Sequence, residues 1–422
     1  MQAQQGHGSD SNHTRLVGFN DLQGRESLQV ILQNDWCYVG HLPGNLPNPL
    51  TGKTESNGTS ILDVSDPSKP TLIAHIPSAP GANCRAVQVV KSPHDGKHYI
   101  ARNHETKAAC SFQVFDISDR AHPVMVAEVA QTPAGPINFA HKGWWDESTG
   151  LYFGSAGEPG FRPGGHLVIW DLSNPAKPKY VSNHWLPGQK RSEPDPGGSG
   201  LSLHHPVVDM ANKRVYMSYN RGGNVAVLDI SDITRPQTIL DFTIAPQFKG
   251  PHTAMPFFGV KCPNFSPGFG DVRDFIVFCN EASDADYLGH EVRTEVFMLD
   301  VTAWENPMTV DVFRTPDGDF LQRGGRFGPH QFNETQDNKL YRPQDNRNLL
   351  YVAYFSGGLR VLDISDPYNM KEVGHYIPQT TATTIPRLKT VIQTNDVDLD
   401  YRGLAYVTDR AGTGLHVIEY LG

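Results

Sequence analysis

One short phrase recurs six times along this chain: an apolar run ends in Asp, and Ser or Thr and a Pro follow it. The first copy is LDVSDP at residues 62–67, and the sixth is LDISDP at residues 362–367. Asp, Ser and Pro are typical of tight turns, and short apolar runs lie on both sides of each copy. Each copy therefore predicts a strand, a turn and a second strand.

The spacing of the copies predicts the fold. The aligned acids are Asp63, Asp116, Asp171, Asp229, Asp300 and Asp363, in steps of 53 to 71 residues. A repeat of this length, built only from strands and turns, is typical of a β-propeller with one four-stranded sheet per repeat. The longest step precedes Asp300 and indicates an insertion. Because the acid recurs in every repeat, we expect it to shape a turn rather than to catalyse.

A seventh repeat at the C-terminal end is incomplete. Its expected strands cover residues 390–393, 403–408 and 415–420, and no fourth strand follows them. The apolar run at residues 15–19 fits no other repeat, so we expect it to supply the missing outer strand and close the ring. The sequence thus predicts an all-β, seven-bladed propeller. We expect one domain over residues 14–422, preceded by a structureless tail over residues 1–13.

The repeated phrase resembles the LVIVD repeat, which is named for this strand-turn consensus. The resemblance covers nearly the whole chain and implies a propeller. It implies no particular activity, because such repeats occur in proteins of varied function.

Composition narrows the classes of partner. The chain has 422 residues, a net charge of −9 and no basic tract, which argues against a nucleic acid or an anionic membrane surface. No apolar run approaches the length of a membrane span. The five cysteines form no Cys-x-x-Cys pair, so a zinc-thiolate site is not expected. Cys262 with Cys279 and Cys84 with Cys110 are two open possibilities for disulfides.

The first residues are polar and lack the apolar core of a signal peptide. We expect a periplasmic or secreted protein whose signal has been removed, with a cytoplasmic protein as the alternative. Nothing in the sequence predicts an oligomeric state.

The inner strands of a propeller line its central channel, so equivalent positions on these strands converge. We aligned the strands on the polar residues that end them, such as Asp146, Asp209 and Asp400. The predicted ring consists of Gln29, Arg85, His141, His204, His252, His330 and Asn395.

Four consecutive members of this ring are histidines: His141, His204, His252 and His330. Imidazole is the commonest protein ligand for transition metals, so the ring predicts one bound ion. Iron or copper is favoured, and zinc or manganese is the alternative. His205 adjoins His204, and strand alternation would let only one of them face the channel; the register favours His204. A metal-free polar channel is the competing interpretation.

The second strand of each blade returns to the same face and ends in polar residues. Three of these are predicted to be catalytic: Arg221, Glu281 and Asp409. The two acids are expected to act as general bases or to orient a ligand histidine, and Arg221 is expected to hold a carboxylate. Four residues are predicted to bind substrate, the arginines through a carboxylate and the tyrosines through an aromatic or apolar surface: Arg85, Tyr219, Tyr354 and Arg410.

These features predict a metal-dependent enzyme that acts on a small organic substrate, either anionic or aromatic. The architecture is similar to that of carotenoid-cleaving oxygenases and of selenium-binding/methanethiol oxidase proteins, which bind a metal through histidines in a propeller. That similarity implies no substrate, because their signature motifs are not shared. We favour an oxidoreductase or oxygenase over a hydrolase or lactonase. A non-catalytic binding scaffold is the alternative of a different class.

Overall fold

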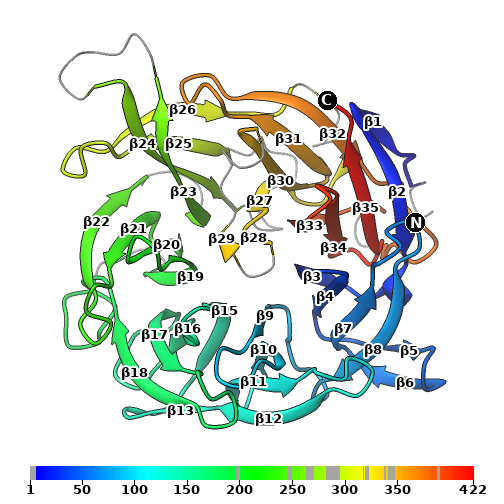
Figure 1. Ribbon diagram of the computed structural model, residues 1–422, viewed down its shortest axis with the longest axis horizontal. Helices are drawn as coiled ribbons and strands as arrows, with labels where there is room; N and C mark the ends of the chain where they lie inside the picture. Colours follow the sequence, from blue (N-terminus) through cyan, green and yellow to red (C-terminus); the bar gives the residue numbers. More distant parts are fainter. Residues whose placement is uncertain are drawn as a thin grey trace.

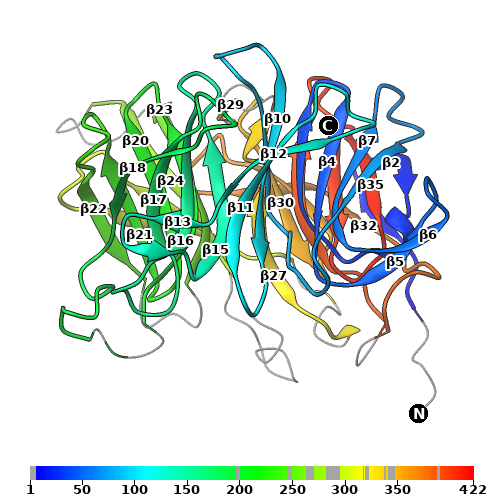
Figure 2. The ribbon, with the colours of Figure 1, turned by 90° about the horizontal axis from the view of Figure 1, so that it is seen from below.

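The computed structural model describes residues 6–195, 197, 200–244, 250–262, 270–281, 295–316, 318, 323–336, 339–340, 347–386 and 390–422. Its four-stranded sheets lie around a central axis as the blades of a ring (Figure 1). Seen from the side, the ring is a thick disc whose strands run between its two faces (Figure 2). The described residues include no helix of the length and apolar character that a membrane crossing requires.

The first four blades follow each other along the chain, and each runs from its inner to its outer strand. Blade one contains β3 (Ser27–Gln33), β4 (Trp36–His41), β7 (Gly58–Asp63) and β8 (Thr71–Pro77). Blade two contains β9 (Val87–Lys91), β10 (His98–Glu105), β11 (Cys110–Asp116) and β12 (Val124–Val129). Blade three contains β15 (Phe139–Trp145), β16 (Leu151–Gly157), β17 (His166–Asp171) and β18 (Lys179–His184). Blade four contains β19 (Ser202–Asp209), β20 (Arg214–Arg221), β21 (Asn224–Asp229) and β22 (Gln237–Thr243).

The last three blades complete the predicted seven. Blade five contains β23 (Pro251–Lys261), β24 (Val272–Asn280), β25 (Val296–Asp300) and β26 (Met308–Phe313). Blade six contains β27 (Phe327–Phe332), β30 (Leu349–Phe355), β31 (Leu359–Asp363) and β32 (Lys371–Ile377). Blade seven contains β33 (Thr394–Leu399), β34 (Ala405–Asp409), β35 (Leu415–Tyr420) and β2 (Thr14–Asn20).

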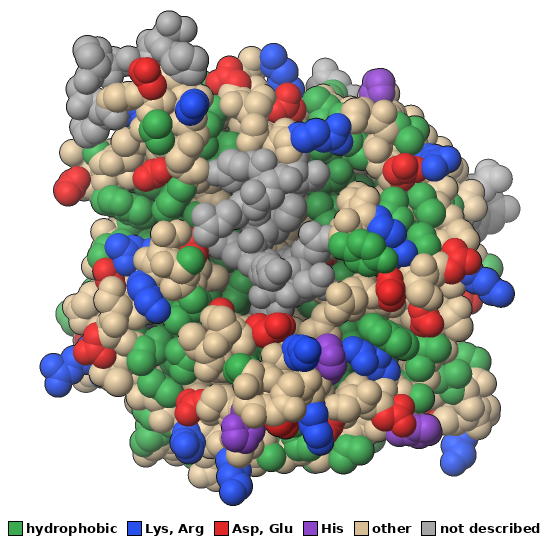
Figure 3. Space-filling view, viewed as in Figure 1, with side chains coloured by type: hydrophobic (Ala, Val, Ile, Leu, Met, Phe, Trp, Pro, Cys, Tyr) green, Lys and Arg blue, Asp and Glu red, His purple; other side chains and the backbone are tan. Residues whose placement is uncertain are grey.

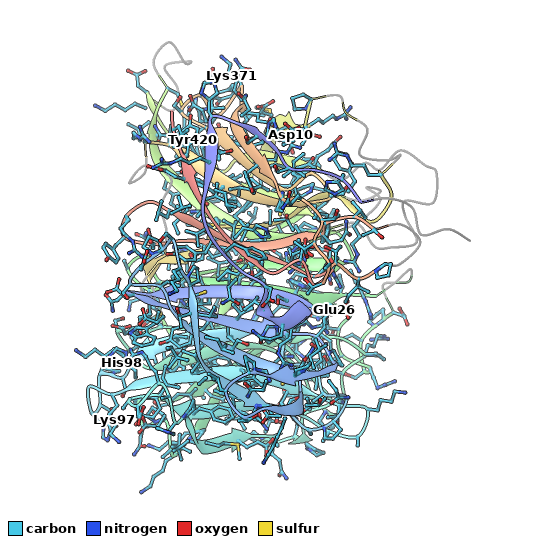
Figure 4. The ribbon with its side chains drawn as sticks, turned by 90° about the vertical axis from the view of Figure 1, so that its right-hand side faces the viewer. Asp10, Glu26, Lys97, His98, Lys371 and Tyr420 are labelled. Carbon is cyan, nitrogen blue, oxygen red and sulfur yellow. The ribbon has the colours of Figure 1, made fainter. Side chains whose placement is uncertain are left out.

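Strand β2 closes the ring as predicted, because it pairs antiparallel with β35 and forms the outer edge of blade seven. The predicted structureless tail is wrong for β1 (Asp10–Asn12), which pairs with β32 on the outside of blade six. The free edge of β32 offers backbone groups that the arriving chain can pair with. Figure 4 shows Asp10, Lys371 and Tyr420 together on this side of the disc.

The repeated Asp shapes a turn, as expected. The carboxylates of Asp63, Asp116 and Asp363 each accept a hydrogen bond from the backbone N–H two residues later, at 2.8 to 2.9 Å. This is the local bond through which Asp stabilises a turn. On either side, Val, Ile, Leu and aromatic side chains are buried between neighbouring blades.

Three short hairpins lie outside the blades. They are β5 (Asn45–Asn48) with β6 (Lys53–Ser56), β13 (Gln131–Thr132) with β14 (Gly135–Pro136), and β28 (Thr335–Gln336) with β29 (Lys339–Leu340). The last hairpin lies at the centre of the ring, where it contacts the inner strands β3, β33 and β19 (Figure 1).

Two details differ from the sequence predictions. Residues 390–393 are not a strand, because the backbone N–H of Gln393 donates to the Asp409 carboxylate and its carbonyl accepts from the Arg410 N–H. The inner strand of blade seven begins at Thr394 instead. All five cysteines are buried free thiols, so neither suggested disulfide forms.

Candidate metal centre

The structure brings all seven residues of the predicted ring to one pocket at an end of the channel. This pocket has a volume of about 120 Å³. Its lining consists of Leu28, Gln29, Arg85, His141, Lys142, His204, Asn220, His252, Glu281, Arg326, His330, Asn395, Asp396 and Arg410. The inner strands of the blades supply most of these side chains, so closure of the ring builds the pocket.

On most inner strands, a β-bulge or a similar break in the strand pairing places the ring residue in the channel. On β19, Leu203 lies opposite Tyr219 and His205 lies opposite Ser218, which leaves His204 as an extra residue. The ladders of β23 and β33 skip His252 and Asn395 in the same way, and those of β3, β15 and β27 are irregular at Gln29, His141 and His330. A bulge breaks the alternation of side chains and re-aims the extra one.

Of the two adjacent histidines, His204 is part of the described lining, as the register favoured, and His205 is not. His205 is buried outside the lining, although the bulge breaks the strand alternation on which the prediction rested. The His205 Nδ1 atom lies 2.8 Å from a carboxylate oxygen of Glu334, which follows β27.

The four ring histidines form a continuous arc. The Nε2 atoms of His141 and His204 are 2.6 Å apart. The ring centroids of His204 and His252 are 3.7 Å apart, and those of His252 and His330 are 3.9 Å apart. Burial lowers the pKa of all four well below its usual value, so the imidazoles are neutral. Neutral imidazole is the form that binds a metal.

Hydrogen bonds fix how three of these rings are turned. The Nδ1 atom of His204 is 3.2 Å from the His252 carbonyl, and that of His330 is 2.5 Å from the Asn395 carbonyl. The Nδ1 atom of His252 is 3.1 Å from the Thr253 hydroxyl oxygen. A carbonyl can only accept, so Nδ1 carries the proton in His204 and His330, which leaves Nε2 with its lone pair.

Glu281, directly after β24, adds a carboxylate to the arc. Its oxygens lie 3.9 Å from His252 Nε2 and 3.6 Å from His330 Nε2. Arg326 donates a hydrogen bond of 2.7 Å to the same carboxylate. Burial acts to raise the pKa of Glu281, but Arg326 and the other positive groups nearby lower it below its usual value. Glu281 is thus held as a carboxylate.

Ligand atoms of His204, His252 and Glu281 lie within 4.8 Å of one another. Two imidazoles and one carboxylate bind iron in non-haem oxygenases and zinc in several hydrolases. The residues present therefore fit a transition-metal ion, with His141 and His330 beside the triad as further imidazoles.

A second polar level lies against the first. Lys142, next to His141, donates to the Gln331 side chain at 2.8 Å and lies 3.7 Å from the Glu334 carboxylate. The Thr253 hydroxyl donates to Gln331 at 2.9 Å. With His205, these residues connect blades three to six beneath the histidines.

The other predicted site residues divide into two groups. Arg85 and Arg410 line the pocket, as does Glu281. Arg221 is exposed at the end of β20 and is not part of the lining. Asp409 is buried, and its carboxylate accepts hydrogen bonds from the backbone N–H groups of Gln393 and Ala411. Burial raises the pKa of Asp409 to about 6. Because its carboxylate is bonded to these backbone groups, Asp409 holds neighbouring loops in place and does not line the pocket.

The two tyrosines are also absent from the lining. Tyr219 is buried in the core, with its hydroxyl 3.9 Å from the Met217 sulfur. Tyr354 packs against Phe327 with ring centroids 5.4 Å apart. Both side chains therefore fill space between blades, and the described part of the lining contains no aromatic side chain apart from histidine.

Four polar residues of the lining were not predicted from the sequence: Lys142, Asn220, Arg326 and Asp396. Lys142 and Asp396 directly follow ring residues, so knowledge of the bulges would have found them. Asn220 lies next to Arg221 at the end of β20, where polar residues were expected at the channel. Arg326 precedes β27 in a loop, where no pattern singled it out.

The LVIVD repeat matches four segments of the chain, residues 54–76, 108–131, 163–184 and 347–377. No curated protein matches the sequence. Three solved structures share the fold at low identity. A hypothetical selenium-binding protein from Sulfolobus tokodaii is 10% identical, with a TM-score of 0.56 over 93% of this chain and 92% of that one.

The other two are similarly distant. A protein from Lactobacillus plantarum is 14% identical, with a TM-score of 0.52 over 90% of this chain and 87% of that one. A periplasmic gluconolactonase from Pseudomonas aeruginosa is 14% identical, with a TM-score of 0.50 over 83% of this chain and 85% of that one. At such identities the likeness establishes the propeller fold and nothing about the reaction.

Proposed function

We propose that this chain, an LVIVD-repeat β-propeller, is a metal-dependent enzyme whose ion is bound by His204, His252 and Glu281. His141 and His330 complete the arc on either side of the two histidines. The substrate would be a small molecule that enters the same pocket.

One observation carries this proposal: neutral imidazoles and a carboxylate converge on one pocket with their ligand atoms close together. The Nδ1 atoms of His204 and His330 are bonded to backbone carbonyls, so Nε2 carries the lone pair in both rings; in His204 this atom faces His141 Nε2 at 2.6 Å, a contact that a bound ion would replace. Hydrogen bonds of this kind hold ligand histidines in metalloproteins. Buried histidines that served only to fill the channel would have no need of a carboxylate beside them.

We favour oxidation as the reaction. Two histidines with one carboxylate, flanked by further imidazoles, suit iron or copper, and such an ion with an open position would supply redox chemistry. The chain itself would bind the substrate beside this position. Arg326 fixes the orientation of Glu281 through a hydrogen bond of 2.7 Å.

Hydrolysis is the second candidate, because two histidines and a glutamate also bind catalytic zinc. The structural relatives do not decide between the two, since one is named a gluconolactonase and another a selenium-binding protein. The third candidate is a scaffold, for which the pocket would be dispensable.

Elemental analysis of the untagged protein tests the proposal. We expect about one transition-metal ion per chain, and at least a tenfold lower affinity in His252→Ala and Glu281→Gln. His416→Phe is the matched control, because His416 is buried in blade seven, away from the pocket. A folded wild-type protein that binds none of iron, copper, zinc or manganese after reconstitution would refute the proposal. Oxygen uptake against lactone hydrolysis by the loaded protein then separates the first two candidates.

A further inference from the structure

The pocket is rich in positive charge. Among the described residues of its lining, four are cationic, Arg85, Lys142, Arg326 and Arg410, and two are acids, Glu281 and Asp396. The chain as a whole has a net charge of −9, so the cations are concentrated here against the overall balance. A bound divalent cation would add to this excess, and an anionic ligand would offset it.

The three arginines converge on one pocket, which already holds one carboxylate. Arg326 donates to Glu281 at 2.7 Å, and Arg85 and Arg410 line the same pocket. They come from separate blades: Arg85 precedes β9, Arg326 precedes β27 and Arg410 follows β34. The pocket is thus built to receive carboxylate oxygens from several directions.

We propose that Arg85, Arg326 and Arg410 bind the carboxylate of a small substrate beside the metal position. The planar fork of guanidinium matches a carboxylate with two parallel hydrogen bonds. This inference rests on the same pocket as the proposed function, whose substrate class it names.

The size and lining of the pocket limit the rest of the substrate. A volume of about 120 Å³ is somewhat less than that of a cavity of roughly 150 Å³ that accommodates benzene. Leu28 is the single apolar side chain among the described residues of the lining. Of the two substrate classes predicted from the sequence, anionic and aromatic, these features favour the anionic one. The substrate would be a short, polar acid or the acidic end of a larger molecule.

Ligand-observed NMR on the full-length protein tests the inference with propionate, its neutral isostere propionamide and inorganic phosphate. We expect saturable binding of propionate that is at least about tenfold tighter than that of propionamide, as loss of a charge-assisted contact predicts. Equal binding of the acid and the amide would overturn the inference. Tighter binding of phosphate than of propionate would overturn the assignment to a carboxylate.

Two variants locate the binding. Arg410→Gln should weaken propionate binding about tenfold, and Arg221→Gln, which changes an exposed arginine outside the lining, should leave it unchanged. Equal effects of the two changes would overturn the inference. The comparison of propionate with propionamide on the wild-type protein decides the matter even if Arg410→Gln does not fold.

Repeating the titrations on metal-depleted protein separates this inference from the proposed function. If the wild-type protein binds no metal on reconstitution but still prefers propionate to propionamide, the metal proposal alone is refuted. Metal binding without any preference for propionate over propionamide would refute the arginine assignment alone.

Discussion

Glu334 connects the buried polar residues that lie against the pocket. Its carboxylate lies 2.8 Å from His205 Nδ1 and 3.7 Å from the Lys142 ammonium. The side chains of Glu334 and Lys142 are almost fully buried, so neither charge is solvated by water. The pair joins the loop after β27 to blades three and four and supports the level on which the histidines rest.

We expect Glu334→Gln to lower the free energy of unfolding by about 3–5 kcal/mol, because it leaves the Lys142 charge buried without a counter-charge. Urea denaturation measures this. Glu419→Gln is the control, since it removes the exposed ion pair with Arg15 and should cost less than about 1 kcal/mol. Similar losses in both variants would show that Glu334 is not a buried anchor.

For single residues, the sequence predicted which positions line the pocket better than it predicted what each side chain does there. Counting back from the polar residue that ends each inner strand found His141, His204 and Asn395, because the blades share one length from bulge to turn. The count assumed regular alternation, and so it could not place Lys142 or Asp396 beside them. Tyr219 and Tyr354 end their strands as the rim residues do, but their side chains fill the space between blades.

Strand β2 is the element that converts an open row of blades into a ring. It pairs along its length with β35, with a register shift between Leu16 and Gly18. At this shift the chain runs close to blade one: a Cβ atom on Gly18 would lie 2.0 Å from the Pro67 carbonyl oxygen. The absence of a side chain at Gly18 therefore lets the closing strand pack against the first blade.

Gly18→Ala should lower the free energy of unfolding by about 1–3 kcal/mol, the usual cost of an overpacked site, because the obstacle is backbone. Gly8→Ala is the matched control, since a Cβ atom there would meet no atom within 4 Å. Thermal unfolding followed by circular dichroism compares the two. Gly18→Ala with a melting temperature equal to that of Gly8→Ala would contradict the close approach.

The elements themselves were largely predictable, since six copies of one phrase define six blades and leave residues 15–19 to close the seventh. The exceptions are instructive. In the predicted strand 390–393, the backbone N–H and carbonyl of Gln393 bond to Asp409 and Arg410. These contacts cross the blade, so no local sequence pattern indicates them. Strand β1 is polar, and only the free edge of β32 makes it a strand.

The whole chain has a net negative charge, whereas the described lining of its pocket has more basic than acidic side chains. On the face seen in Figure 3, basic and acidic side chains are interspersed around the rim of the disc. Because every blade supplies part of the pocket, the metal centre exists only in the closed ring. A ligand that binds only the folded state stabilises it.

We therefore expect the preferred metal ion to raise the melting temperature of the wild-type protein, and to raise that of Glu281→Gln much less. Glu105→Gln serves as the control, because Glu105 pairs with Arg85 but lies outside the lining. Differential scanning calorimetry with and without the ion measures both shifts. An equal rise in Glu281→Gln would mean that the ion binds elsewhere.

Buried neutral histidines should make the stability of the whole ring depend on pH. Burial lowers the pKa of His75 and of His416 to about 4. Below about pH 6.5 the unfolded chain binds protons that the folded one excludes, so each such histidine lowers the free energy of unfolding by about 1.4 kcal/mol per pH unit. Asp409, with its pKa raised to about 6, has the opposite effect on the free energy of unfolding between pH 6 and 4, but the buried histidines are more numerous.

Urea denaturation should show the free energy of unfolding falling from pH 7 to 5. The fall should be shallower in His416→Phe and unchanged in the exposed variant His122→Phe, and equal slopes in all three proteins would refute this account.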